Sequence, residues 1–310
     1  SVASWPIQTE NVTRSRARGS SALASSLWLV CRKRPATTRP GWDNRVLEEM
    51  RANVTQRLRD FWDAGIRGPD VVWAATGPAL EAYSRYPAVR LADEPGQTMD
   101  VSTFLHQVRR MVVDFVVGRL LSPADESQAN ALDDVTTYYL LHRQHFGHDA
   151  APVGACILYA VSCNLSEQDL VSRYDLLAHG KAAPSSTDED DDEGGDGNGT
   201  EEQPVERTTK ATLRLKRWSQ RKGKNLGFTA PRGQPVPLID RMHRLMHLWR
   251  AGDVSAVDEY LRGEALLANP IFSQVLQALI ELEKNGNGDR ALLESISNHI
   301  AGPGGLPLAP

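Results

Sequence analysis

The sequence predicts an α+β protein that is mainly helical, with strands in two separate places. From residue 40 onward, most apolar residues recur at steps of three and four, which is typical of helices with one buried face. Near the start, the run Leu27 to Cys31 is apolar without alternation, which favours a strand covered on both faces. Farther on, Thr208 to Trp218 alternates and favours a half-exposed strand.

We divide the chain into five parts: residues 1–36, terminal strands; 37–150, a helical accessory region; 151–232, a winged-helix-like module; 233–301, C-terminal helices; and 302–310, a flexible tail.

Two strands are expected at the start, at Ala3 to Thr9 and Leu23 to Arg34, joined by a polar, arginine-rich loop. A ribbon of two strands cannot cover both faces of an apolar run. The chain begins with Ser rather than Met, and its first residues lack the pattern of a signal peptide. We therefore expect the rest of the sheet to lie upstream, which would make this chain the C-terminal piece of a longer protein.

Four helices are expected between residues 43 and 150, because caps and prolines punctuate the apolar pattern. The expected starts are Asp43, Pro69, Asp100 or Ser102, and Ser122-Pro123, and the expected stops of the first two helices are Gly65 and Pro87. The fourth helix is expected to run through Leu132 to Leu141.

A helix, a turn, a second helix and a basic strand follow, which is the order of elements in a winged helix. Val153 to Val161 forms the first helix, Ser166 caps the second, and Gly180 is expected to end it. Residues 182–206 have the composition of disorder, so they would be an insertion before the wing. Beyond residue 232, four further apolar stripes predict the C-terminal helices.

Charge is distributed unevenly along the chain. Ten acidic residues lie between Asp188 and Glu206, and leaving them out changes the net charge from -4 to +6. Arg207 to Lys224 holds eight basic residues and Arg14 to Arg39 holds seven, with no acidic residue in either stretch. These stretches indicate a polyanionic partner, most simply nucleic acid. The alternative is charge on a solvated face that only maintains solubility.

The DNA-binding residues that we expect lie in these two stretches. The first group is on the rim loop, and the second is on the basic strand and its continuation. They are Arg14, Arg16 and Arg18, and then Arg214, Lys216, Arg217, Trp218, Arg221 and Lys222. Trp218 could stack on a base while the cations contact phosphates. Its alternative role is to pack against the body of the small module.

Neither a metal site nor a catalytic group is expected from residue spacing. His142, His145 and His148 would spread around a helix, and His243 and His247 share a helix face without the glutamate of a zincin motif. The G-x-G-x-G pattern at 195–199 lies in acidic sequence that would repel a phosphate.

Three cysteines without a C-x-x-C pair favour a reducing, cytoplasmic setting. No apolar run approaches the roughly 20 residues that span a bilayer, so no membrane partner is expected.

Two blocks of sequence carry a resemblance to a known family. The first is W-P-I-Q-T-E at residues 5–10 followed by A-L-A-S-S-L-W-L-V-C-R-K-R at 22–34. The second is A-A-T-G-P-A at 74–79 followed by Y-S-R-Y at 83–86. The first block resembles the closing portion of the methylase domain in large adenine-specific DNA methylases, and the second is similar to a segment farther downstream in the same proteins, which have an N-terminal domain of unknown function and often a Zn-ribbon. The resemblance covers residues 1 to about 120 well and about 150–218 loosely.

The resemblance implies an S-adenosylmethionine-dependent DNA methyltransferase that acts on adenine after flipping it out of the duplex. The two N-terminal strands would then be the closing antiparallel strands of its Rossmann-like sheet. The D-P-P-Y and F-x-G-x-G motifs of such enzymes do not occur in this sequence, so its catalytic and cofactor residues would lie upstream. A role in DNA modification or phage defence, with protein partners from such a system, is implied as well.

A different class of function stays open. The helical part could be a non-enzymatic scaffold, in which the winged-helix-like module docks on an acidic protein, on nucleic acid, or on the chain's own acidic segment. A standalone winged-helix regulator is a third possibility, but it would leave the N-terminal strands without a role.

Overall fold

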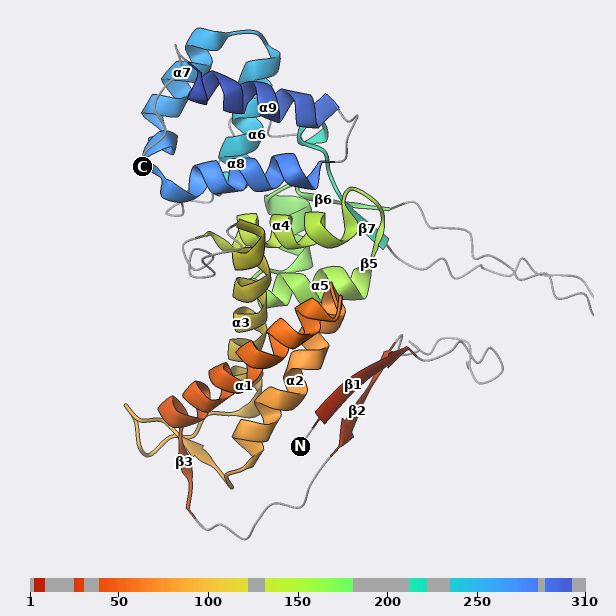
Figure 1. Cartoon of the computed structure of the whole chain (residues 1–310), viewed down its shortest axis with the longest axis vertical. Helices are drawn as coiled ribbons and strands as arrows, with labels where there is room; N and C mark the ends of the chain where they lie inside the picture. Colours follow the sequence, from red (N-terminus) through yellow and green to blue (C-terminus); the bar gives the residue numbers. More distant parts are fainter. Residues whose placement is uncertain are drawn as a thin grey trace, which may run out of the picture.

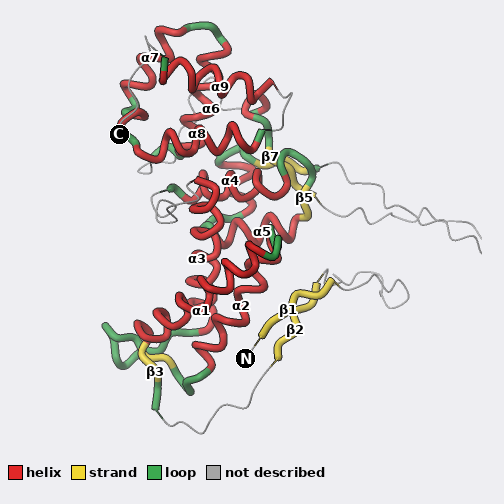
Figure 2. The backbone as a smooth tube through the Cα atoms, viewed as in Figure 1, coloured by secondary structure: helices red, strands yellow, loops and turns green. Residues whose placement is uncertain are grey.

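The computed structural model confirms a mainly helical α+β protein (Figure 1). It describes residues 3–8, 25–30, 39–121, 132–180, 212–221, 235–283 and 288–302. In these residues, helices dominate and the strands are short and lie in separate places (Figure 2). None of the described helices combines the length and the apolar character needed to cross a bilayer.

The N-terminal strands form a hairpin, as the sequence predicts. β1 (Ala3–Gln8) pairs antiparallel with β2 (Ser25–Val30), with Trp5 opposite Trp28. β1 lies beside helix α2 (Pro69–Ser84), as Figure 1 shows. On α2, Ala74 and Gly77 are buried, and their small side chains allow a close neighbour.

Helices α1 (Asp43–Asp63), α2 and α3 (Val101–Leu121) form the core of the first half. The apolar stripe expected on α1 is buried at Val46, Met50, Val54 and Leu58. Asp100 caps α3 as expected, because its carboxylate accepts a hydrogen bond from the Thr103 amide at 2.8 Å. Asp43 is the first residue of α1 and not its cap, and it instead accepts a hydrogen bond from the Ala92 amide at 2.8 Å.

Two short strands, β3 (Gly41–Trp42) and β4 (Val89–Arg90), pair in parallel beside these helices. The sequence analysis did not anticipate them, because two residues are too few to show alternation.

The fourth helix begins later than the sequence indicates. α4 spans Asp134–Phe146, and its cap is Asp133, whose carboxylate accepts a hydrogen bond from the Thr136 amide at 2.8 Å. The prediction of a helix running through Leu132 is therefore wrong. The expected start at Ser122-Pro123 lies outside the described residues.

A small sheet follows α4. β5 (Ala151–Pro152) leads into α5 (Val153–Ser162), and Ser166 then caps a short helical stretch that ends with the turn Asp169–Arg173. Gly180 does not end that helix, because β6 (Leu177–His179) comes first. β7 (Thr212–Leu215) pairs antiparallel with both other strands, so the sheet order is β5-β7-β6. Leu213 and Leu215 are buried, which confirms the alternation predicted for this strand.

We call residues 132–180 and 212–221 the sheet module. The C-terminal helices are α6 (Leu238–Arg250), α7 (Val254–Gly263), α8 (Pro270–Leu282) and α9 (Gly288–Ala301). A short 3-10 turn, η5 (Leu266–Ala268), joins α7 to α8.

One carboxylate serves two helix starts where these parts meet. Asp133 Oδ2 accepts a hydrogen bond from the amide of Leu238 at 2.9 Å, while the hydroxyl oxygen of Thr136 accepts one from the amide of Ile239, also at 2.9 Å. The cap of α4 thereby also satisfies the first amides of α6, and it fixes the C-terminal helices on the sheet module.

Candidate functional site

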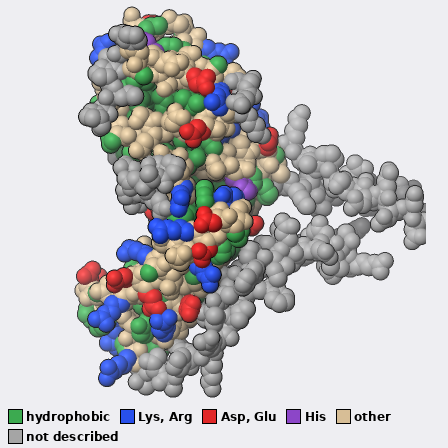
Figure 3. Space-filling view, in the orientation of Figure 1, with side chains coloured by type: hydrophobic (Ala, Val, Ile, Leu, Met, Phe, Trp, Pro, Cys, Tyr) green, Lys and Arg blue, Asp and Glu red, His purple; other side chains and the backbone are tan. Residues whose placement is uncertain are grey.

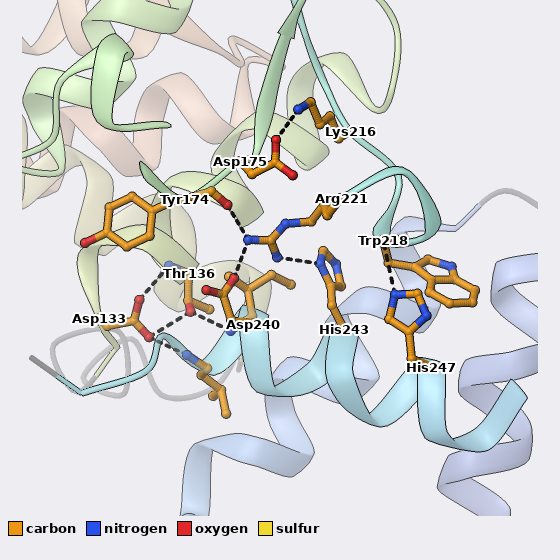
Figure 4. Close-up of polar contacts among 12 residues, drawn as sticks. Asp133, Thr136, Tyr174, Asp175, Lys216, Trp218, Arg221, Asp240, His243 and His247 are labelled. Atoms are coloured by element: carbon orange, nitrogen blue, oxygen red, sulfur yellow. Dashed lines mark hydrogen bonds and ion pairs between the residues drawn. The ribbon is translucent and has the colours of Figure 1, made fainter. Parts of the chain in front are cut away.

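The basic segment, residues 212–221, comprises β7 and the 3-10 turn η3 (Trp218–Gln220). It belongs to the sheet module and lies beside α6, where Figure 4 shows its side chains directed toward acidic and histidine partners. Six of the expected DNA-binding residues belong to this segment or directly follow it, so their exposure decides how much of the prediction holds.

Arg221 is an interior residue. Its side chain is fully buried, forms an ion pair with Asp240 at 2.6 Å, and donates hydrogen bonds to the Tyr174 carbonyl at 2.5 Å and to His243 Nδ1 at 2.8 Å. Figure 4 shows the guanidinium enclosed by these groups. The structure therefore contradicts the expectation that Arg221 contacts DNA phosphates.

Trp218 is also buried, with 4% of its surface exposed. Its indole N–H donates a hydrogen bond to Asp289 at 2.9 Å, and its ring packs edge-on against His247. Stacking on a base would require this ring to leave its site, so the structure contradicts the nucleic-acid role. Trp218 is a packing residue, but its partners His247 and Asp289 belong to the C-terminal helices α6 and α9 and not to the body of the small module.

The neighbouring cations are partly exposed but engaged. Lys216 forms an ion pair with Asp175, and Arg217 forms one with Asp289 at 2.9 Å. The guanidinium of Arg214 lies 3.4 Å from the side-chain carbonyl of Gln220. The acidic partners come from distant parts of the sequence, so the basic segment neutralises charge within the protein. Arg14, Arg16, Arg18 and Lys222 lie outside the described residues.

Burial changes the protonation of this network. Desolvation raises the pKa of Asp240 to about 6, although the charge of Arg221 opposes the rise. Burial, reinforced by the same guanidinium, holds the pKa of His243 well below its ordinary value. Its Nδ1 therefore accepts the hydrogen bond from Arg221 without carrying a proton of its own.

A cysteine and a histidine meet elsewhere in the sheet module, but they are not arranged for catalysis. Cys156 Sγ lies 3.7 Å from His142 Nε2, and both residues are buried. Burial raises the pKa of the Cys156 thiol to about 11 and lowers that of His142 to about 4. Neither the thiolate nor the imidazolium of an activated pair is therefore populated near pH 7.

The short helical stretch at 167–173 carries two acidic residues and one basic residue. Glu167 and Asp169 are half-buried, Gln168, Ser172 and Arg173 are exposed, and Arg173 lies 3.7 Å from Asp169. On the face of the molecule that Figure 3 shows, acidic and basic side chains of the described residues are interspersed.

Sequence reasoning did not identify Asp175, Asp240 and Asp289, which anchor the basic segment. Each is an isolated acidic residue in an unremarkable context, and only the fold brings it to its cation.

No protein-family model, curated protein or solved structure matches this chain.

Proposed function

We propose that this chain is a non-catalytic region of an S-adenosylmethionine-dependent, adenine-specific DNA methyltransferase. In this proposal the β1–β2 hairpin completes the sheet of the methylase domain, and the helices form an accessory platform. The cofactor and the flipped adenine would be held by residues upstream, because this sequence lacks the D-P-P-Y and glycine motifs.

The observation that carries the proposal is the contact between α2 and β1. The two blocks that resemble the methylases are far apart in sequence, yet the second lies on α2 and the first includes β1, which runs beside it. Ala74 and Gly77 are buried on this helix. Small residues on a helix allow a neighbouring backbone to approach closely, which is a physical role that this motif could have on α2.

We further propose that the sheet module is a winged helix. The order of α4, β5, α5, the stretch 167–173, β6 and β7, with β7 between the other two strands, fits that fold. The acidic residues 182–206 then fall between β6 and β7, in the position of the wing itself.

The proposal is tested in the organism that carries the gene. Disrupting the gene should remove N6-methyladenine from at least one sequence motif in the genome, as read by single-molecule sequencing. A Gly77→Leu variant should reduce this methylation, because Gly77 is buried on α2 and a larger side chain there would displace the elements that pack on this helix, β1 among them. Ala52→Leu, on the exposed side of α1, is the matched control and should not. Unchanged adenine methylation after disruption would contradict the proposal.

A second function is favoured by the charges of the sheet module. A winged helix that reads DNA presents cations on its second helix and wing. Here the corresponding stretch carries Glu167 and Asp169 against one cation, Arg173, and the connection between β6 and β7 carries ten acidic residues. We propose that this module docks on a basic protein surface.

Measuring the binding of a DNA duplex at two salt concentrations separates protein docking from DNA binding by the sheet module. Protein docking predicts that the full chain binds DNA weakly, and that Arg214→Glu changes this little. If the segment 185–206 instead acts as an internal DNA mimic, its deletion should raise DNA affinity, most strongly at low salt. Tight binding that Arg214→Glu abolishes would restore the basic segment as a DNA contact.

A further inference from the structure

Three metal-ligating side chains converge where the sheet module meets the C-terminal helices. They are His148, in the turn after α4, Glu283, at the end of α8, and Asp289, in the first turn of α9. One donor atom from each lies within 4.8 Å of the other two. Sequence spacing groups His148 with His142 and His145, whereas the fold groups it with two carboxylates far downstream.

The imidazole of His148 is oriented for ligation. Its Nδ1 lies 3.4 Å from the carbonyl oxygen of Leu215, an acceptor that favours the tautomer with the proton on Nδ1. Nε2 then carries a lone pair, and it lies 4.0 Å from Glu283 Oε1. A backbone carbonyl that holds the second ring nitrogen is the usual support of a metal-bound histidine.

The surroundings leave room for a cation and favour its charge. A cavity of about 350 Å³ adjoins two of the three groups, because His148 and Glu283 line it together with Arg143 and Arg217. Among the charged residues that line the cavity, taken together with Asp289, four carboxylates outnumber two guanidinium groups, which leaves a net charge of -2 with the histidines neutral; two of the carboxylates, Asp149 and Glu281, are exposed. The residues counted are Asp149, Glu281, Glu283, Asp289, Arg143 and Arg217.

We propose that His148, Glu283 and Asp289 bind one divalent transition-metal ion of the zinc type. One nitrogen and two carboxylate oxygens suit Zn²⁺ better than Mg²⁺ or Ca²⁺, which prefer oxygen alone. Donors about 2.1 Å from a tetrahedral metal are roughly 3.4 Å apart, so the side chains must close by about 1 Å. The fourth position faces the cavity, where a water molecule fits.

In this site, Arg143 and Arg217 would hydrogen-bond to the two metal-binding carboxylates. Arg143 pairs with Glu283, while Arg217 Nη1 and Trp218 Nε1 each lie 2.9 Å from one carboxylate oxygen of Asp289. A carboxylate oxygen has two lone pairs, so it can accept such a hydrogen bond and still ligate. The metal would join α8 and α9 to the turn after α4, and so reinforce the contact between the two parts.

The test uses the full chain without a histidine tag, stripped with a chelator and then titrated with Zn²⁺ by calorimetry. We expect one ion per chain, a rise in melting temperature, and much weaker binding of Mg²⁺. His148→Gln should lower the Zn²⁺ affinity at least tenfold while leaving the melting temperature of the metal-free chain nearly unchanged.

His299→Gln is the matched control, because His299 also faces a carboxylate, Asp258 at 2.8 Å, but lies outside the cluster. This variant should bind Zn²⁺ as the parent does. No binding to the stripped chain, or equal binding by the His148→Gln variant, would overturn the proposal.

Discussion

Replacing Arg221 with methionine tests whether the basic segment is held in place by a buried ion pair. The methionine keeps most of the length and the apolar stem of the arginine but removes its charge. Asp240 would then be a carboxylate with only 5% of its side chain exposed and without its ion-pair partner. The Tyr174 carbonyl would also lose the hydrogen bond that Arg221 donates.

The expected loss is large at neutral pH. Removing one partner of a buried ion pair costs about 3–5 kcal/mol, because the remaining charge is desolvated. The lost hydrogen bond to the carbonyl adds about 1 kcal/mol. A double variant, Arg221→Met with Asp240→Leu, should recover most of the loss, since replacing both partners by apolar groups is often neutral.

The measurement is the free energy of unfolding in urea, followed by circular dichroism at pH 7 and pH 5. The pKa of Asp240, about 6 in the parent, should rise further in the variant, so protonation at pH 5 removes the uncompensated charge. The deficit of the variant should therefore shrink on acidification. Arg173→Met, which removes an exposed ion pair with Asp169, is the control and should cost less than about 1 kcal/mol.

Two results would refute this reasoning. One is a loss in Arg221→Met no larger than that in Arg173→Met, which would mean that removing Arg221 leaves no uncompensated buried charge on Asp240. The other is a deficit of the same size at both pH values, which would mean that Asp240 is not the group left charged.

Three other predictions concern the same fold. Burial lowers the pKa of His142 to about 4. The neutral side chain therefore contributes stability that is present above pH 6.5 and is lost as pH falls toward 4. Between pH 7 and pH 5, the free energy of unfolding in urea should fall by about 2 kcal/mol more in the parent chain than in a His142→Phe variant. Gly68→Ala should destabilise the chain by more than about 2 kcal/mol, because φ is +73° and the new Cβ would lie 2.1 Å from the His145 ring. Gly65→Ala, where φ is +79° but no neighbour lies within 4 Å, should cost only about 1 kcal/mol, as measured by thermal unfolding. Burial raises the pKa of the Cys156 thiol to about 11, so this residue should react with a thiol reagent at pH 8 only after denaturant is added. Rapid labelling of Cys156 in the native chain would contradict its burial.

The helices could be predicted from the sequence because the signals that define them are local. The stripe Val46, Met50, Val54 and Leu58 and the cap Asp100 are read within one or two turns, and the structure confirms both. The sequence does not predict the break at Leu132, because Asp133 caps α4 through Thr136, a weaker signal that also serves α6.

The environment of the basic segment could not be predicted in the same way. Alternation correctly placed Leu213 and Leu215 inward, but it carries no information on what covers the end of the strand. Trp218 and Arg221 are buried because α6 and the first turn of α9 pack over them and supply Asp240 and Asp289. Such pairing depends on tertiary contacts between residues that are far apart in sequence.

The pairing of β6 with β7 has a consequence for the length of the chain between them. His179 is opposite Leu213, and the Gly180 amide donates to the Thr212 carbonyl at 2.8 Å, so the stretch 181–211 leaves and returns at neighbouring points. A two-residue hairpin turn could close the same gap, and the entropy of loop closure changes by only about 2–3 kcal/mol between such lengths. This position therefore tolerates shortening or the insertion of a foreign domain, and variation between natural sequences should concentrate here while the ladder on either side is preserved.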